Sequence, residues 1–66
     1  MLVSENNKLQ ILSFLQLGKY KAVEEKSNIL LNEGYSDPWL CNILAVCLAK
    51  QKKYLLAVKY FEILRD

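Results

Sequence analysis

The sequence contains no histidine, and this absence excludes several kinds of chemistry. Histidine is the usual general base near neutral pH, the commonest metal ligand and the partner of serine or cysteine nucleophiles. The two glycines, Gly18 and Gly34, lie too far apart to form a phosphate-binding loop. Glu24 and Glu25 would point about 100° apart on a helix, so they do not form an acid–base pair. We therefore expect no enzyme activity, no cofactor and no bound metal.

Net charge is also small. The 66 residues include 9 Lys and Arg against 7 Asp and Glu, which gives a net charge of +2. The charges are interspersed, which argues against nucleic acid or a membrane surface as a partner. The basic cluster of Lys50, Lys52 and Lys53 suits a helix C-terminus, where cations interact favourably with the helix dipole. No aromatic residues alternate with these lysines, as they would in a nucleic-acid binding stripe.

Long apolar runs are absent as well, so no segment is expected to span a bilayer. The N-terminus lacks the basic start and apolar stretch of a secretion signal. The two cysteines, Cys41 and Cys47, would lie roughly 9 Å apart along a helix and on different faces, which is too far for a disulfide. We expect buried free thiols in a cytoplasmic protein, with a redox-sensing thiol as the alternative.

What the chain does contain is apolar residues at helical spacing. The hydrophobic share of 53% excludes a disordered chain. Asp37 and Pro38 are favoured at the start of a helix, and Gly34 just after the end of one. In the third segment the apolar residues follow the i, i+3, i+4, i+7, i+8 pattern of an amphipathic helix: Leu40, Ile43, Leu44, Cys47 and Leu48. The sequence predicts an all-α protein with four helices, at about 5–17, 20–33, 38–50 and 54–65.

The two halves of the chain resemble each other at an offset of 34 residues. Gly18-Lys19-Tyr20 matches Lys52-Lys53-Tyr54 at this offset. The apolar pairs are Leu9 with Ile43, Leu12 with Val46, Phe14 with Leu48, Val23 with Ala57 and Leu30 with Leu64. A 34-residue period of paired helices is typical of tetratricopeptide repeats.

The sequence resembles the tetratricopeptide repeat (TPR) family, and the second half is the clearer copy. It carries the family's pattern of large and small residues at Leu44, Ala45, Leu48, Tyr54, Ala57 and Phe61. The first half departs from the pattern at Gln10, Ile11 and Ser27. The resemblance implies a single TPR-like domain over residues 1–66, with repeat one at about 5–34 and repeat two at about 37–66. Its four antiparallel helices would form two helix-turn-helix hairpins of an α-solenoid.

The resemblance also implies a concave groove lined by the first helix of each repeat. Carried over by position, the groove residues are Lys8, Leu12, Leu15, Trp39, Asn42, Val46, Ala49 and Lys50. Trp39 follows Pro38 in the first helical turn, where its ring could be half exposed, and tryptophan is favoured at binding hot spots. The alternative for Trp39 is packing beneath the Gly34–Tyr35 loop as part of the core.

The last helix is more apolar than its counterpart in the first half. Leu55, Leu56 and Tyr60 stand where the first half has Lys21, Ala22 and Lys26. Exposed apolar surface of this kind marks contact sites. We expect a next repeat or a second copy to cover a face made of Leu55, Val58, Tyr60, Phe61 and Leu64.

Together, these features predict a non-catalytic protein-interaction module. It would bind a peptide or helix in the groove, self-associate through its last helix, or do both. The partner would be a protein or peptide, with a homo-oligomer or further TPR repeats also expected. The alternative is a small structural homo-oligomer, or a secretion-chaperone or scaffold subunit built from such hairpins.

Overall fold

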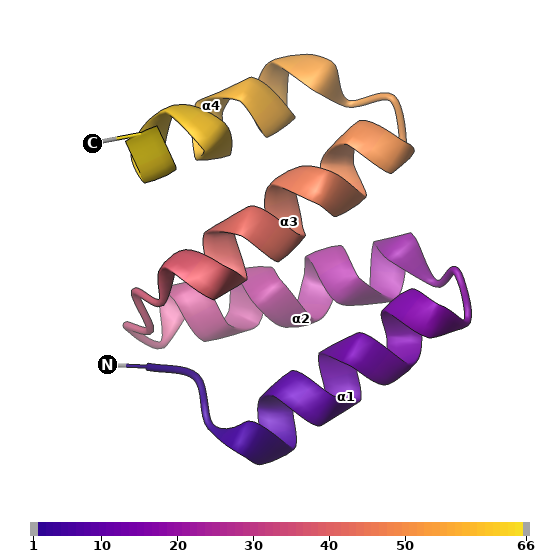
Figure 1. Ribbon diagram of the computed structural model, residues 1–66, viewed down its shortest axis with the longest axis vertical. Helices are drawn as coiled ribbons and strands as arrows, with labels where there is room; N and C mark the ends of the chain where they lie inside the picture. The colour runs from indigo at the N-terminus through magenta and orange to yellow at the C-terminus, as the bar shows by residue number, and fades with distance from the viewer. Residues whose placement is uncertain (1, 66) are drawn as a thin grey trace.

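The computed structural model describes residues 2–65, which form four helices and contain no strand. The helices are α1 (Glu5–Gln16), α2 (Tyr20–Asn32), α3 (Pro38–Lys50) and α4 (Tyr54–Arg65) (Figure 1). The predicted all-α fold is confirmed. The first two helices end one residue earlier than predicted, because Leu17 and Glu33 serve as their C-caps. None of the helices in the described part of the chain is long and apolar enough to cross a membrane.

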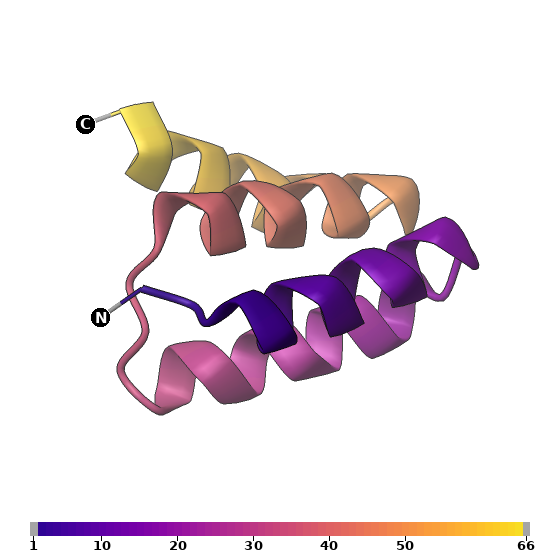
Figure 2. The ribbon, with the colours of Figure 1, turned by 60° about the horizontal axis from the view of Figure 1, so that its bottom comes forward.

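Each helix packs antiparallel to the next one along the chain. In Figures 1 and 2, α1 and α3 run in the same direction, whereas α2 and α4 run in the opposite direction. Figure 2 shows α1 and α3 in front and α2 and α4 behind them. The arrangement is two stacked helical hairpins, joined by the packing of α2 against α3.

The first three helices end in the same way. The residue after each C-cap has a positive φ: 71° at Gly18, 98° at Gly34 and 63° at Lys52. The following N–H then donates to a carbonyl five residues back: Lys19 to Phe14, Tyr35 to Leu30 and Lys53 to Leu48. This is the Schellman motif, which satisfies carbonyls that a helix end leaves free. Gly18 and Lys52 are 34 residues apart, so the repeat of the sequence is also a repeat of backbone conformation.

Two clusters of buried side chains hold the helices together. The first, which we call the bridging cluster, joins the N-terminal segment, α1, α2 and α3 through Val3, Ile11, Val23, Leu30, Leu40 and Cys47. The second joins α3 to α4 through Leu44, Leu48 and Ala57. Because the bridging cluster takes residues from both hairpins, neither hairpin completes its own core.

Both cysteines are buried and free, as expected. Burial raises the pKa of the Cys41 and Cys47 thiols, and the nearby carboxylates of Asp37 and Glu24 act in the same direction. Reactive thiols have a lowered pKa, so these cysteines are better suited to packing than to redox sensing.

Candidate interaction surfaces

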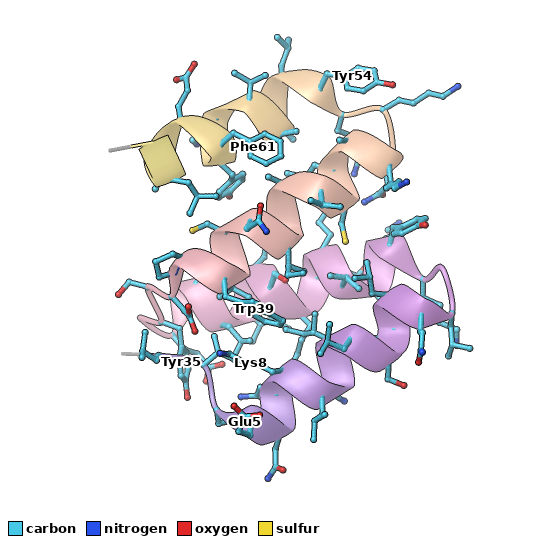
Figure 3. All side chains as sticks on the ribbon, viewed as in Figure 1. Glu5, Lys8, Tyr35, Trp39, Tyr54 and Phe61 are labelled. Atoms are coloured by element: carbon cyan, nitrogen blue, oxygen red, sulfur yellow. The ribbon has the colours of Figure 1, made fainter. Side chains whose placement is uncertain are left out.

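The predicted groove residues Lys8 and Trp39 meet at the N-terminal ends of α1 and α3 (Figure 3). The Lys8 Nζ lies 5.2 Å from the centroid of the Trp39 ring, within the range of a cation–π interaction. The same Nζ lies 3.7 Å from the Asp37 Oδ2. Trp39 is half-buried and packs against the bridging cluster. Its ring therefore both supports the core and contributes to the surface.

Asp37 is buried and links three parts of the chain. Its Oδ1 accepts a hydrogen bond from the Trp39 N–H at 3.0 Å, which caps α3 as the sequence predicts. Its Oδ2 accepts from the Val3 N–H at 3.2 Å and also pairs with Lys8. Sequence reasoning missed the contacts with Val3 and Lys8, because residues so far apart in sequence leave no local signal.

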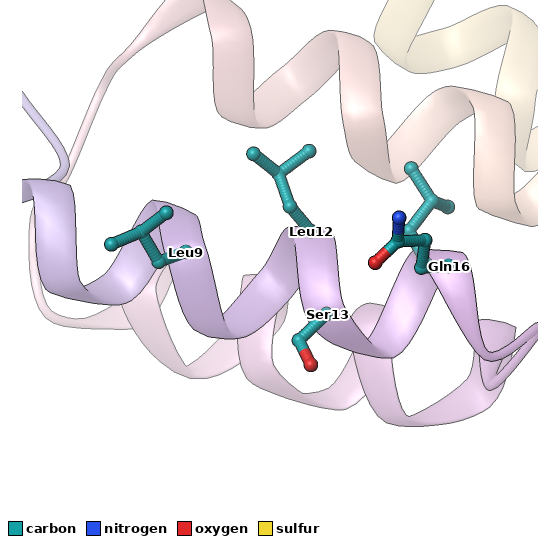
Figure 4. A pocket seen from close by; sticks show the side chains of 5 residues that line it. Leu9, Leu12, Ser13 and Gln16 are labelled. Carbon is teal, nitrogen blue, oxygen red and sulfur yellow. The ribbon is translucent and has the colours of Figure 1, made fainter.

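An open hollow with a volume of about 460 Å³ lies along α1. It is lined by Leu9, Leu12, Ser13, Leu15 and Gln16 (Figure 4). Two predicted groove residues, Leu12 and Leu15, are among them, and Figure 4 shows Leu12 pointing from α1 toward α3. The hollow is mainly apolar, so it suits an apolar side chain of a bound segment.

The other predicted groove residues lie along α3. Asn42 and Lys50 are exposed, and Val46 is half-buried. Ala49 is also half-buried and packs against the cluster between α3 and α4. The structure thus brings Lys8 to Trp39 and Leu12 to Leu15, while the remaining four residues follow one another along α3.

The largest collection of exposed apolar side chains lies on α4, and we call it the α4 surface. It consists of Tyr54, Leu55, Leu56, Val58, Phe61 and Ile63. Leu55 is 90% exposed, the highest value among the exposed large hydrophobic residues. Sequence reasoning named Leu55, Val58 and Phe61 for this face but missed the other three.

Two residues of the predicted α4 face are less exposed than its other members. Tyr60 and Leu64 are half-buried, and Tyr60 packs against the cluster between α3 and α4. A second hollow, of about 290 Å³, lies at the start of the helix and is lined by Lys52, Lys53, Tyr54, Leu55 and Leu56. Whether an apolar residue faces inward depends on how α4 packs on α3, which the count of apolar residues does not determine.

One polar contact joins the two hairpins. Glu24 of α2 accepts hydrogen bonds from the Lys53 Nζ at 3.1 Å and the Gln51 Nε2 at 2.9 Å, both in the α3–α4 turn. Burial alone would raise the pKa of Glu24. The hydrogen bonds from Lys53 and Gln51, with the charges of Lys53 and Lys21, outweigh burial and lower this pKa below its ordinary value.

The described side chains offer little material for catalysis or metal binding. Among residues 2–65, no group of three or more histidine, cysteine, aspartate or glutamate residues is placed to hold a metal ion. In comparisons with known proteins, the chain matches no family model, no curated protein and no solved structure. The functional argument therefore rests on the surfaces described above.

Proposed function

We propose that the chain is a non-catalytic protein-interaction module built from two TPR-type hairpins. The 34-residue recurrence of the turn at Gly18 and Lys52 supports the repeat assignment. The partner would be a protein or peptide, a further repeat or another copy of the chain, rather than nucleic acid or a membrane. A reducing cytoplasm fits the two free, buried thiols.

The α4 surface is the observation that carries this proposal. Its six large apolar side chains are exposed on a single helix. Removing apolar surface from water yields roughly 25 cal/mol per Å², so a partner that covers these residues gains binding free energy directly. Contiguous exposed apolar surface on a small protein marks an interaction site.

The test combines light scattering after size exclusion, over a hundredfold range of concentration, with binding of an apolar fluorescent dye. We expect the folded chain to self-associate or to bind the dye, and Leu55→Lys with Val58→Lys to reduce whichever signal is seen. Ile29→Lys on α2 is the control, because Ile29 is exposed to a similar degree but lies off α4. A monomer that binds no dye would contradict the proposal.

The same measurement separates the structural alternative. A stable homo-oligomer at every concentration would favour a structural or scaffold subunit, or a secretion chaperone built from these hairpins. A folded monomer that binds dye would favour an adaptor whose α4 surface receives a different protein.

A second candidate is capture of a peptide in the groove along α1 and α3. The hollow at Leu12 and Leu15, together with the Lys8–Trp39 contact, favours it. If this groove is the binding surface, Leu12→Lys should weaken capture of a partner peptide while Leu55→Lys leaves it unchanged. The opposite result would assign binding to α4.

A further inference from the structure

The two ends of the hairpin stack differ in chemistry. In α3, Leu40 and Cys47 are fully buried in the bridging cluster. The residues 34 positions earlier, on α1, are Asn6 and Ser13, and both are exposed. Leu44 of α3 is likewise fully buried, whereas its counterpart Gln10 on α1 is exposed. The α1 end therefore presents polar side chains where α3 presents apolar ones, and it is suited to contact with water.

The opposite end is suited to contact with another helix. α2 receives the second hairpin through Tyr20, Glu24 and Ser27. Tyr20 packs on the bridging cluster, Ser27 is fully buried, and Glu24 bonds to the α3–α4 turn. The residues 34 positions later on α4 remain exposed: Tyr54 at 60%, Val58 at 50% and Phe61 at 43%. The face that α2 uses to hold α3 thus recurs on α4 in a more apolar form.

We infer that α4 binds an amphipathic helix of a partner polypeptide in the way that α2 binds α3. This inference rests on the proposed function and specifies its partner. The partner helix runs antiparallel to α4 and offers apolar residues at positions i, i+4 and i+7, the spacing of Leu40, Leu44 and Cys47. A second copy stacked in the same manner would offer Asn6, Gln10 and Ser13 instead, so it is a poor occupant.

Two replacements between α2 and α4 narrow the chemistry of the partner. Val58 stands where α2 has Glu24, so no carboxylate is present there to pair with a lysine. A charged residue of the partner opposite Val58 would lose its water without gaining a counter-charge. Phe61 stands where α2 has the small Ser27, so the partner needs a small residue opposite Phe61 for the helices to approach closely.

The experiment extends the full chain after Asp66 by a flexible glycine-serine linker of about ten residues and a copy of residues 38–50. Such a linker gives an effective concentration in the millimolar range. The matched control copy carries L40N, L44Q and C47S, which are the residues that α1 has at these positions. Stability in denaturant and amide hydrogen exchange of α4 are measured under reducing conditions.

The expected result is at least a tenfold larger folding equilibrium constant, and slower exchange in α4, for the native copy alone. Val58→Lys in the host chain should remove this gain. Ile63→Lys should preserve it, because Ile63 is similarly exposed, at 53%, but lies about 140° away around α4. Val58→Gln provides a milder variant if lysine disturbs α4.

Three outcomes would overturn the inference: no gain from the native copy, an equal gain from both copies, or a gain that survives substitution of Val58. A homodimer of the unextended chain that Val58→Lys dissociates would also overturn it, by making a second copy the occupant. If the tethered helix fails while dye binding still depends on Leu55 and Val58, the proposed function survives with a different partner.

Discussion

Lys52 has a φ of 63°, in the left-handed region that its counterpart Gly18 also adopts. A side chain in this region costs roughly 1–2 kcal/mol, because Cβ approaches the following carbonyl oxygen. We expect Lys52→Gly to raise the free energy of unfolding by about 0.5–1 kcal/mol, after the entropy lost by glycine is counted. Gly18→Ala should lower it by about 1 kcal/mol, and this loss comes from the backbone alone, since nothing lies within 4 Å of a Cβ there. Urea unfolding measures both changes, and a destabilised Lys52→Gly would contradict this account.

Ser27 is fully buried, and its hydroxyl has no hydrogen-bond partner among the described residues. An unsatisfied buried hydroxyl costs about 1–3 kcal/mol, and alanine is the better helix former. We expect Ser27→Ala to raise the free energy of unfolding by about 1 kcal/mol. Ser13→Ala, at an exposed position of α1, is the control and should change it by less than about 0.5 kcal/mol. A loss of stability in Ser27→Ala would show that the hydroxyl is satisfied after all.

At the scale of the helices, the start of α3 depends on Asp37, which caps the helix and also holds the N-terminal segment. Asp37→Ala should lower the free energy of unfolding by about 2 kcal/mol, because it removes a cap and leaves the buried Val3 N–H without its acceptor. Asp37→Asn should cost less, since asparagine also caps helices. Chemical denaturation tests both variants. Lys8→Met should cost under about 1 kcal/mol, as expected for a part-exposed ion pair, and an equal cost for Lys8 and Asp37 would contradict the assignment.

The contact between α2 and the α3–α4 turn gives the fold a dependence on pH. The folded pKa of Glu24 lies below its unfolded value, so its contribution is fully present above the unfolded pKa of about 4.3. It is lost as the pH falls through the folded pKa. We expect Glu24→Gln to lower the free energy of unfolding by about 0.5–1 kcal/mol at pH 7, a small value because Lys53 is largely exposed. Denaturant unfolding at several pH values should show this difference shrinking below pH 4, and a constant difference would contradict the assignment.

At the scale of the whole molecule, stability depends on the cluster that joins the hairpins. Leu40→Ala should lower the free energy of unfolding by about 2–4 kcal/mol, because Leu40 is fully buried in the bridging cluster. A chain of 66 residues has little stability to spare, so this loss should unfold much of the population. Leu55→Ala should change stability by under about 0.5 kcal/mol. Thermal melts compare the two, and an intact second hairpin in Leu40→Ala would show that the hairpins fold independently.

Much of the fold could be predicted from the sequence, because helix ends are set by residues close in sequence. Asp37 and Pro38 start α3, and Gly18 and Gly34 follow the ends of α1 and α2, as local capping requires. The ends of α1 and α2 were predicted one residue too long, since a C-cap residue is only half inside its helix. The candidate surfaces were less predictable. Three of the five residues predicted for the α4 face belong to the α4 surface, whereas Tyr60 and Leu64 are half-buried.

The sequence by itself determined the four helices, their turns and the scarcity of catalytic groups, because these follow from composition and from interactions within a few residues. Only the tertiary structure decided which helix faces meet. The Val3–Asp37 and Glu24–Lys53 contacts join residues 34 and 29 positions apart. The burial of Tyr60 and the exposure of Leu56 on the same helix likewise depend on how α4 lies against α3. Helix periodicity places side chains around an axis, but the rotation and approach of that axis are set by packing against other helices.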